Sequence, residues 1–164
     1  MPILKPDFYY RGFADVDAGL LRARGISALL VDIDNTILPR DSTELALGVS
    51  DWAAGLHREG FRVALISNNW YGHVKRISDE LDFGMVSKAL KPLPFAFLYA
   101  ARLLGAKRHE IAVVGDQIFT DVLGGNLSGM TTVLVQPLSK ADLPHTLVLR
   151  RLERRVLKGR EPLP

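Results

Sequence analysis

The chain has 164 residues, 48% hydrophobic and 24% charged, a composition that excludes a disordered protein and suits one globular domain with a buried core. It contains no cysteine, which excludes disulfides and thiolate metal sites. The sequence shows neither the apolar core of a signal peptide nor an apolar run of about 18 residues, so we expect a soluble, cytoplasmic protein. The net charge is +3, and its excess lies between Lys140 and Pro164, where seven Lys and Arg face three Asp and Glu.

In chain order, short apolar segments rich in branched residues alternate with segments of helical period. The apolar segments predict buried strands at Ile26–Val31, Arg62–Ile66, Ile111–Val114 and Thr131–Val135, with Phe83–Val86 as a short fifth strand. The helical pattern covers Asp15–Arg24, Asp51–Arg58, His73–Leu81, Pro94–Leu104 and Ile118–Leu127, and a basic helix follows at about residues 145–158. This alternation predicts an α/β fold, a three-layer open parallel sheet with helices on both faces, as a single domain over residues 1–164.

Polar residues follow the predicted strands at the point where each strand ends. The first strand leads into Asp32-Ile33-Asp34-Asn35-Thr36 and the second into Ser67-Asn68-Asn69. The strand Ile111–Val114 leads into Gly115-Asp116, with Asp121 shortly after, and Lys91-Pro92 precede a helix. Ligands of open parallel sheets bind outside the carboxyl ends of the strands. We therefore expect these side chains to gather at one edge of the sheet.

Four carboxylates at one edge, those of Asp32, Asp34, Asp116 and Asp121, would repel one another unless a cation lay among them. Oxygen ligands without His or Cys suit Mg²⁺, and Lys91 adds a fixed positive charge. Such a site suits phosphoryl transfer. In an extended segment Asp32 and Asp34 project to the same side, so one can attack phosphorus while the other transfers protons.

The segments DIDNT, SNN, LKP and GDQIFTD, in this order, resemble the four motifs of the haloacid dehalogenase superfamily of phosphatases. The chain is most similar to the IIIA-type, YqeG-like branch, which includes phosphatidylglycerophosphate phosphatases. The resemblance runs from about Gly25 to Arg155. Its most branch-specific parts are GDQIFTDVLGGN and the later LRRLE stretch, residues 149–153.

The resemblance implies a role for each motif residue. Asp32 is the expected nucleophile, Asp34 the general acid and base, and Thr36 orders the loop. Ser67 is expected to bind the transferring phosphoryl group, although a serine here is also a candidate helix N-cap. Lys91, with Lys88 as a weaker competitor, holds Asp32 and the phosphate. Asp116 binds Mg²⁺ directly, Asp121 directly or through water, and Asp34 through its backbone carbonyl.

The substrate is less closely defined. The spacings between Thr36, Ser67 and Lys91 are used up by predicted helices and strands, so no cap domain fits, and an uncapped site admits bulky substrates. The resemblance favours a phosphatidylglycerophosphate-like lipid, with a phosphatase of soluble metabolites, nucleotides or phosphoproteins, or a non-catalytic binding module, as alternatives. A nucleic acid partner is not expected. The basic amphipathic C-terminal helix either lies on an anionic membrane or docks its apolar stripe on the sheet.

Overall fold

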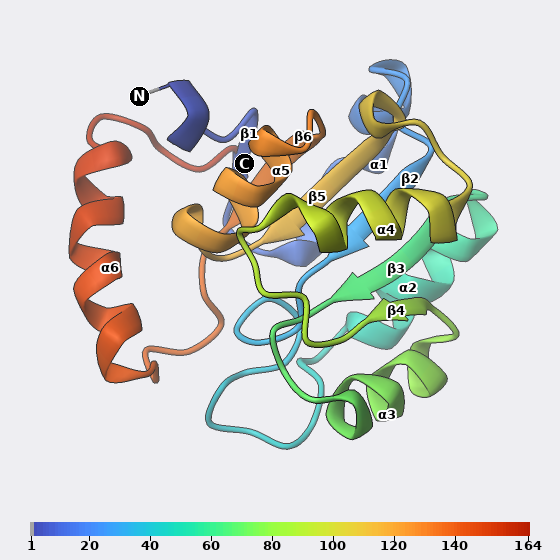
Figure 1. Cartoon of the computed structure of the whole chain (residues 1–164), viewed down its shortest axis with the longest axis horizontal. Coiled ribbons are helices and arrows are strands. Elements are labelled where there is room, and N and C mark those ends of the chain that lie inside the picture. The colour runs from blue at the N-terminus through green and yellow to red at the C-terminus, as the bar shows by residue number, and fades with distance from the viewer. Residues whose placement is uncertain (1) are drawn as a thin grey trace.

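The computed structural model describes residues 2–164, whose strands form one six-stranded parallel sheet with helices on both faces (Figure 1). The strand order is β1-β6-β5-β2-β3-β4, and every neighbouring pair is parallel. The strands are β1 (Phe8–Tyr10), β2 (Ala28–Val31), β3 (Arg62–Ile66), β4 (Gly84–Val86), β5 (Ile111–Gly115) and β6 (Thr131–Val135). The predicted α/β class with a parallel sheet is confirmed.

The helices follow the strands in the predicted alternation. They are α1 (Ala18–Ala23), α2 (Val49–Arg58), α3 (Tyr71–Leu81), α4 (Pro94–Leu104), α5 (Leu123–Leu127) and α6 (Pro144–Val156), with short 3-10 turns at η1 (Pro2–Leu4), η2 (Phe13–Asp15) and η3 (Arg108–Glu110) and a π-helical turn at η4 (Ile118–Val122). Helix α1 begins after Asp17, whose side chain accepts a hydrogen bond from the Leu20 backbone N–H at 2.8 Å.

Two apolar clusters cover the two faces of the sheet. One joins alternate residues of β2, β3, β5 and β6 to α1, α2 and α3, and the other joins the intervening strand residues to α4. Alternate residues of a strand point to opposite faces, and near-continuous apolar strands such as Ala28–Val31 serve both faces at once. At Gly124, an added Cβ would lie 2.4 Å from the Phe97 ring, so this glycine permits α4 and α5 to pack closely.

Two local features differ from the sequence-based expectation. Strand β1 was not predicted, because three residues are too few to show a period; it pairs with β6 at the edge of the sheet, Phe8 opposite Val133. The predicted helix over 118–127 begins instead as a π-helical turn, in which the Val122 N–H reaches the Gln117 carbonyl at 3.2 Å. Such turns are frequent at functional sites, and this one contains Asp121.

No cap domain is inserted among residues 2–164. Between β2 and β3 the chain forms a loop and α2, and only α3 separates β3 from β4. Helix α6 instead stands beside the β1–β6 side of the sheet (Figure 1). None of the helices described over this range is long and apolar enough to cross a membrane.

Candidate active site

The carboxyl ends of the central strands meet at one edge of the sheet. Strand β2 lies between β5 and β3, with Val31 opposite both Val114 and Leu65. The next residue, Asp32, donates its backbone N–H to the Val114 carbonyl at 2.8 Å, so the chain stays in line with the sheet for one more position. Asp32 therefore lies in the middle of the edge at which parallel sheets bind ligands.

Lys91 reaches this edge from the segment between β4 and α4, and its ammonium group joins two acidic side chains. Its Nζ lies 2.5 Å from Asp32 Oδ1 and 2.6 Å from Asp121 Oδ1, and all three residues are buried. Burial alone lowers the pKa of a lysine, but the charges of Asp121 and Asp32 outweigh it and the Lys91 pKa is raised. Lys91 is thus a fixed positive charge beside Asp32, whereas Lys88 is exposed.

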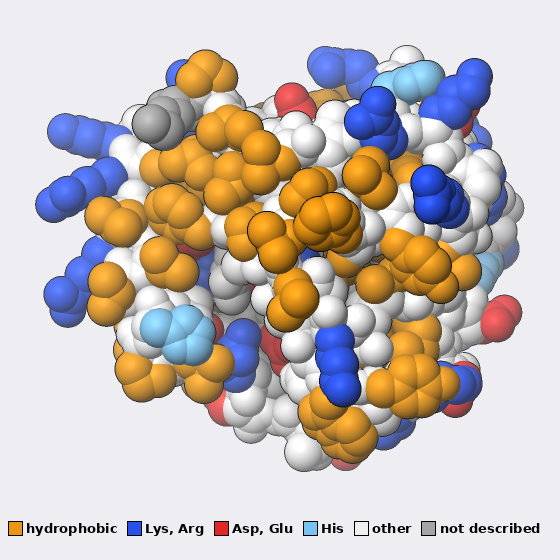
Figure 2. Space-filling view, viewed as in Figure 1, with side chains coloured by type: hydrophobic (Ala, Val, Ile, Leu, Met, Phe, Trp, Pro, Cys, Tyr) orange, Lys and Arg blue, Asp and Glu red, His pale blue; other side chains and the backbone are white. Residues whose placement is uncertain are grey.

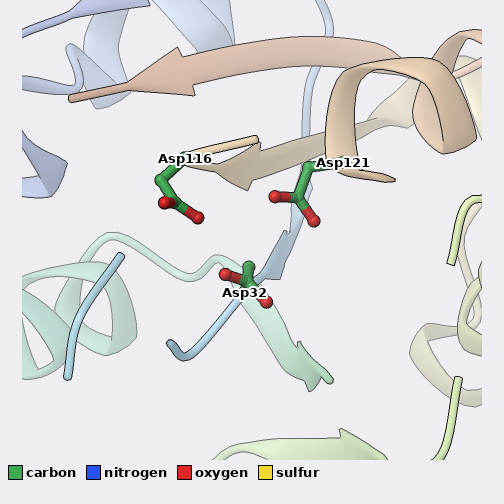
Figure 3. Close-up of side chains that lie close together, drawn as sticks. All are labelled: Asp32, Asp116 and Asp121. Carbon is green, nitrogen blue, oxygen red and sulfur yellow. The ribbon is translucent and has the colours of Figure 1, made fainter. Parts of the chain in front are cut away.

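Three buried carboxylates, those of Asp32, Asp116 and Asp121, surround a common point (Figure 3). Each offers one oxygen to a set whose atoms lie within 4.8 Å of one another. The Thr36 hydroxyl donates to Asp32 Oδ2 at 3.1 Å and lies 3.5 Å from Asp116 Oδ1. Thr36 therefore links the first two of these carboxylates.

Burial and the charge of Asp32 both raise the pKa values of Asp116 and Asp121. Burial raises the pKa of Asp116 well above its ordinary value, and the Asp32 charge raises it further. Burial also raises the pKa of Asp121 to about 6, against the opposing charge of Lys91. The charged forms are thus destabilised in this cluster, a condition that a bound divalent cation would relieve.

Gly115 provides the space that Asp121 occupies. A Cβ at position 115 would lie 2.3 Å from the Asp121 carboxyl carbon, closer than any side chain tolerates. The Asp121 Oδ2 also accepts a hydrogen bond from the Gln117 backbone N–H at 3.2 Å. Glycine before Asp116 is therefore required for Asp121 to fold back over the end of β5.

The Asp34 side chain lies outside the carboxylate cluster and faces the cavity above it. Burial raises the pKa of Asp34, and the nearby charge of Asp32 raises it further; Arg40, His73 and a hydrogen bond with Asn69 oppose the shift. A carboxyl group with a raised pKa stays protonated to a higher pH than a free aspartic acid. Asp34 is thus suited to donating a proton near Asp32.

A cavity of about 340 Å³ opens over this edge. Its walls include Asp32, Asp34 and Lys91 on the sheet side and, on the other, residues at the start of α6: Leu143, His145, Thr146 and Leu149. Ser67 is fully buried and does not line the cavity; its Oγ accepts the Asn69 backbone N–H at 3.0 Å. Nor is Ser67 a helix cap, because α3 begins at Tyr71 after Trp70.

Two residues of this region had no role assigned from the sequence. The Asn68 side chain accepts the Lys91 backbone N–H at 2.7 Å and donates to the Lys91 carbonyl at 3.4 Å. Arg150 of α6 forms an ion pair with Asp116. Asn68 belongs to the SNN motif and Arg150 to the LRRLE stretch. Both motifs were recognised in the sequence, but the contacts that these two residues make could not be read from it.

The comparisons with known proteins agree with this geometry. The family model for haloacid dehalogenase-like hydrolases matches residues 7–129. A Bacillus subtilis protein described as "Probable phosphatase YqeG" is 34% identical over 154 residues, which are 94% of this chain and 90% of that protein.

Two further matches are more distant. The Arabidopsis thaliana phosphatidylglycerophosphate phosphatase 1 is 28% identical over 87% of this chain, which spans only 44% of the plant protein. The solved structure of a cobalt-bound deoxy-D-mannose-octulosonate 8-phosphate phosphatase from Haemophilus influenzae shares the fold, with a TM-score of 0.53, 15% identity, and coverage of 84% of this chain and 90% of that one. The chain therefore belongs to the haloacid dehalogenase-like hydrolase family, as a phosphatase of its YqeG-like branch.

Proposed function

We propose that this phosphatase hydrolyses a phosphate monoester with Mg²⁺ through a phosphorylated Asp32, and that its substrate is a phosphatidylglycerophosphate-like lipid. The observation that carries the proposal is the meeting of Asp32 and Lys91, which line one cavity, with two further buried carboxylates, those of Asp116 and Asp121. The arrangement provides a nucleophile, a fixed cation and ligands for a second, divalent cation.

The donor set fits Mg²⁺. Its side chains offer carboxylate oxygens, the hard ligands that Mg²⁺ prefers, and the raised pKa values of Asp116 and Asp121 favour a divalent cation among them. Asp116 and Asp121 would hold the ion, with Asp32 and the Asp34 carbonyl as further ligands. When bound, Mg²⁺ would neutralise charge on the oxygens of the phosphoryl group.

The two steps of the reaction use Asp32 and Asp34 in turn. In the first, an oxygen of Asp32 bonds to phosphorus, the bond from phosphorus to the leaving oxygen breaks, and Asp34 gives its proton to that oxygen. In the second, water attacks phosphorus, the bond to Asp32 breaks, and Asp34 takes the proton of the water. Lys91 stabilises negative charge beside Asp32 throughout.

The lipid assignment draws on a relative and on the surface around the cavity. A plant relative is named for phosphatidylglycerophosphate. Apolar side chains are exposed on α6 at Leu147, Val148 and Leu152, and on α4 at Phe95 and Tyr99. Figure 2 shows hydrophobic side chains spread over this face, with Lys and Arg projecting at the side occupied by α6. Exposed apolar groups ringed by cations suit an anionic lipid surface.

The first experiment measures phosphate release from p-nitrophenyl phosphate with MgCl₂ or with EDTA, for the wild type and for Asp32→Asn. We expect the wild type to be active only with Mg²⁺. Asp32→Asn should be inactive although its circular dichroism and melting temperature match those of the wild type. Activity in EDTA would refute the metal dependence, and an active Asp32→Asn would refute the nucleophile.

The second experiment tests the lipid. Phosphatidylglycerophosphate in vesicles is compared with glycerol 3-phosphate and nucleoside monophosphates under Mg²⁺, and kcat/KM is expected to be higher for the lipid. Co-sedimentation with anionic vesicles is measured in parallel. It should weaken when four exposed cations at the C-terminal end are neutralised, namely Arg151, Arg154 and Arg155 of α6 and Lys158 just after it. Higher kcat/KM for a soluble ester would favour the alternative, a phosphatase of soluble metabolites.

A further inference from the structure

Helix α6 turns polar side chains toward the protein and apolar ones toward solvent. Its two buried residues are Thr146 and Glu153, whereas Leu147 is 49% and Val148 60% exposed. Packing alone would bury the leucines and valines of an amphipathic helix. The apolar stripe was expected either to lie on a membrane or to dock on the sheet; at its C-terminal end, Val156 and Leu157 are partly buried against the core. Polar contacts, not apolar burial, hold the middle of α6.

Those contacts centre on Arg150, whose guanidinium binds three acidic residues. Its Nη2 donates to Asp116 Oδ2 and its Nη1 to the Asp116 carbonyl at 2.5 Å. The same guanidinium donates to Asp142 Oδ2 at 3.0 Å and to Glu153 Oε2 at 3.1 Å. Arg150 thus donates hydrogen bonds to both the side chain and the backbone of Asp116, and the carboxylates of Asp142 and Glu153 fix the orientation of the Arg150 guanidinium.

Glu153 and Asn35 connect α6 and the segment before it to the loops of the site. Glu153 Oε1 accepts the Ile118 backbone N–H at 2.7 Å, at the start of the turn that carries Asp121. Asn35, in the loop after Asp32, donates from Nδ2 to the Ala141 carbonyl at 3.0 Å and accepts from Ser139 Oγ at 2.9 Å. The segment that leads into α6 is therefore tied to the nucleophile loop, and α6 itself to the loop of the predicted metal ligands.

The two oxygens of the Asp116 carboxylate have separate partners. Oδ2 binds Arg150, and Oδ1 lies 3.5 Å from Thr36 Oγ1, on the side of Asp32. Arg150 thus fixes the Asp116 side chain while leaving its other oxygen in the carboxylate cluster. Hydrogen-bonding partners behind a metal ligand orient it, and their loss typically weakens metal binding about 10–100-fold.

We propose that Arg150 is a positioning residue for the divalent cation, so that the C-terminal helix, through the LRRLE stretch, completes the metal site of this phosphatase. The inference rests on the proposed Mg²⁺ dependence. It assigns Arg150 to orienting Asp116 and Glu153 to holding Arg150 and the loop at Ile118.

The test measures Mg²⁺ binding directly, by isothermal titration calorimetry of the full-length protein with MgCl₂, and by the rise in melting temperature with MgCl₂ concentration. Arg150→Gln should raise the Kd for Mg²⁺ about 10–100-fold. Arg150→Lys should recover part of this loss, because an ammonium group keeps the charge but not the forked contacts. The matched control is Arg151→Gln, on the exposed side of the same helix, which should bind Mg²⁺ as the wild type does.

Kinetics separate positioning from a merely structural role. The Mg²⁺ concentration for half-maximal activity should rise in Arg150→Gln, while kcat at saturating Mg²⁺ stays within a few-fold of the wild type. If Arg150→Gln does not fold, Arg150→Lys and Glu153→Gln carry the same measurement, and each should weaken Mg²⁺ binding.

An unchanged Kd in a folded variant would overturn the inference, and so would tighter binding, which would mean that Arg150 competes with the cation. Wild-type protein that neither binds nor needs Mg²⁺ would instead refute the proposed function itself. The two failures are therefore distinguishable.

Discussion

The side-chain amide of Asn68 pairs with the peptide groups of Lys91. It accepts the Lys91 N–H at 2.7 Å and donates to the Lys91 carbonyl at 3.4 Å, so the end of β3 holds the backbone from which the Lys91 side chain enters the site. A misplacement of about 1 Å in such a group costs about 10²-fold in rate. Asn68 is thus a support for the charge beside Asp32.

We expect Asn68→Ala to lower kcat by about 10–100-fold with a small effect on the melting temperature. The matched control is Asn126→Ala. Asn126 also donates to two backbone carbonyls, those of Ile3 and Lys5, at 2.7 and 3.1 Å. These acceptors belong to the N-terminal segment, and neither they nor Asn126 line the cavity. Its loss should reduce stability and leave kcat unchanged. Equal kcat values for the two variants would contradict the role of Asn68.

Replacement of Lys91 tests the central ion pairs. Lys91→Met removes the cation between Asp32 and Asp121, and we expect kcat to fall roughly 10²–10³-fold. The metal-free protein should also lose about 3–5 kcal/mol of unfolding free energy, because the carboxylates are left without their partner. Urea unfolding in EDTA measures the second effect. Lys88→Met, an exposed neighbour in the chain, should behave as the wild type; loss of activity there instead would reverse the assignment of the motif lysine.

Most of the sheet and the acidic cluster could be predicted from the sequence, because both rest on local pattern. Strands such as Arg62–Ile66 can be predicted from their runs of apolar residues. Because the strands are parallel, their carboxyl ends lie at one edge of the sheet. Asp32 and Asp116 are brought together by that topology alone.

The contacts of α6 could not be predicted in the same way. Arg150 is 34 residues from Asp116 in the chain. Helical spacing places Arg150 near leucines of the same helix, so the hydrophobic pattern predicts that the leucines, not Arg150, are buried. Which face docks is decided by buried carboxylates elsewhere in the fold. The π-helical turn at Ile118 likewise depends on tertiary contacts, since its backbone N–H is bound by Glu153.

The raised pKa of Asp121 predicts a pH-dependent stability. A carboxyl whose folded pKa is about 6, above its ordinary 3.8, stabilises the native state below the ordinary value, and this contribution is lost as the pH rises through about 6. In EDTA, the melting temperature should therefore fall between about pH 4 and pH 7, and MgCl₂ should reverse the fall. Asp121→Asn should make the profile shallower, with the contribution of Asp116 remaining, and should reduce the effect of MgCl₂.

The control for that profile is Asp79→Asn, which removes an exposed carboxylate paired with Lys75 on α3. An exposed pair of this kind contributes little to stability, so the wild-type pH profile should persist. Identical profiles for Asp121→Asn and the wild type would mean that the Asp121 charge is not destabilised in the metal-free fold.

Asp34→Asn separates the two halves of the reaction. The p-nitrophenolate leaving group departs without a proton, so phosphorylation of Asp32 should continue, whereas activation of the water in the second step should fail. We expect a burst of about one equivalent of p-nitrophenol per enzyme, followed by turnover slowed about 10²–10⁴-fold. With an alkyl phosphate, whose leaving oxygen needs the proton, no burst should form. Asp41→Asn, an exposed residue of the same loop, should turn over both substrates normally. Equal slowing of both substrates without a burst would place Asp34 outside proton transfer. A residue that transfers protons in both steps should, when replaced, let the phosphorylated enzyme accumulate with p-nitrophenyl phosphate but prevent it from forming with an alkyl phosphate.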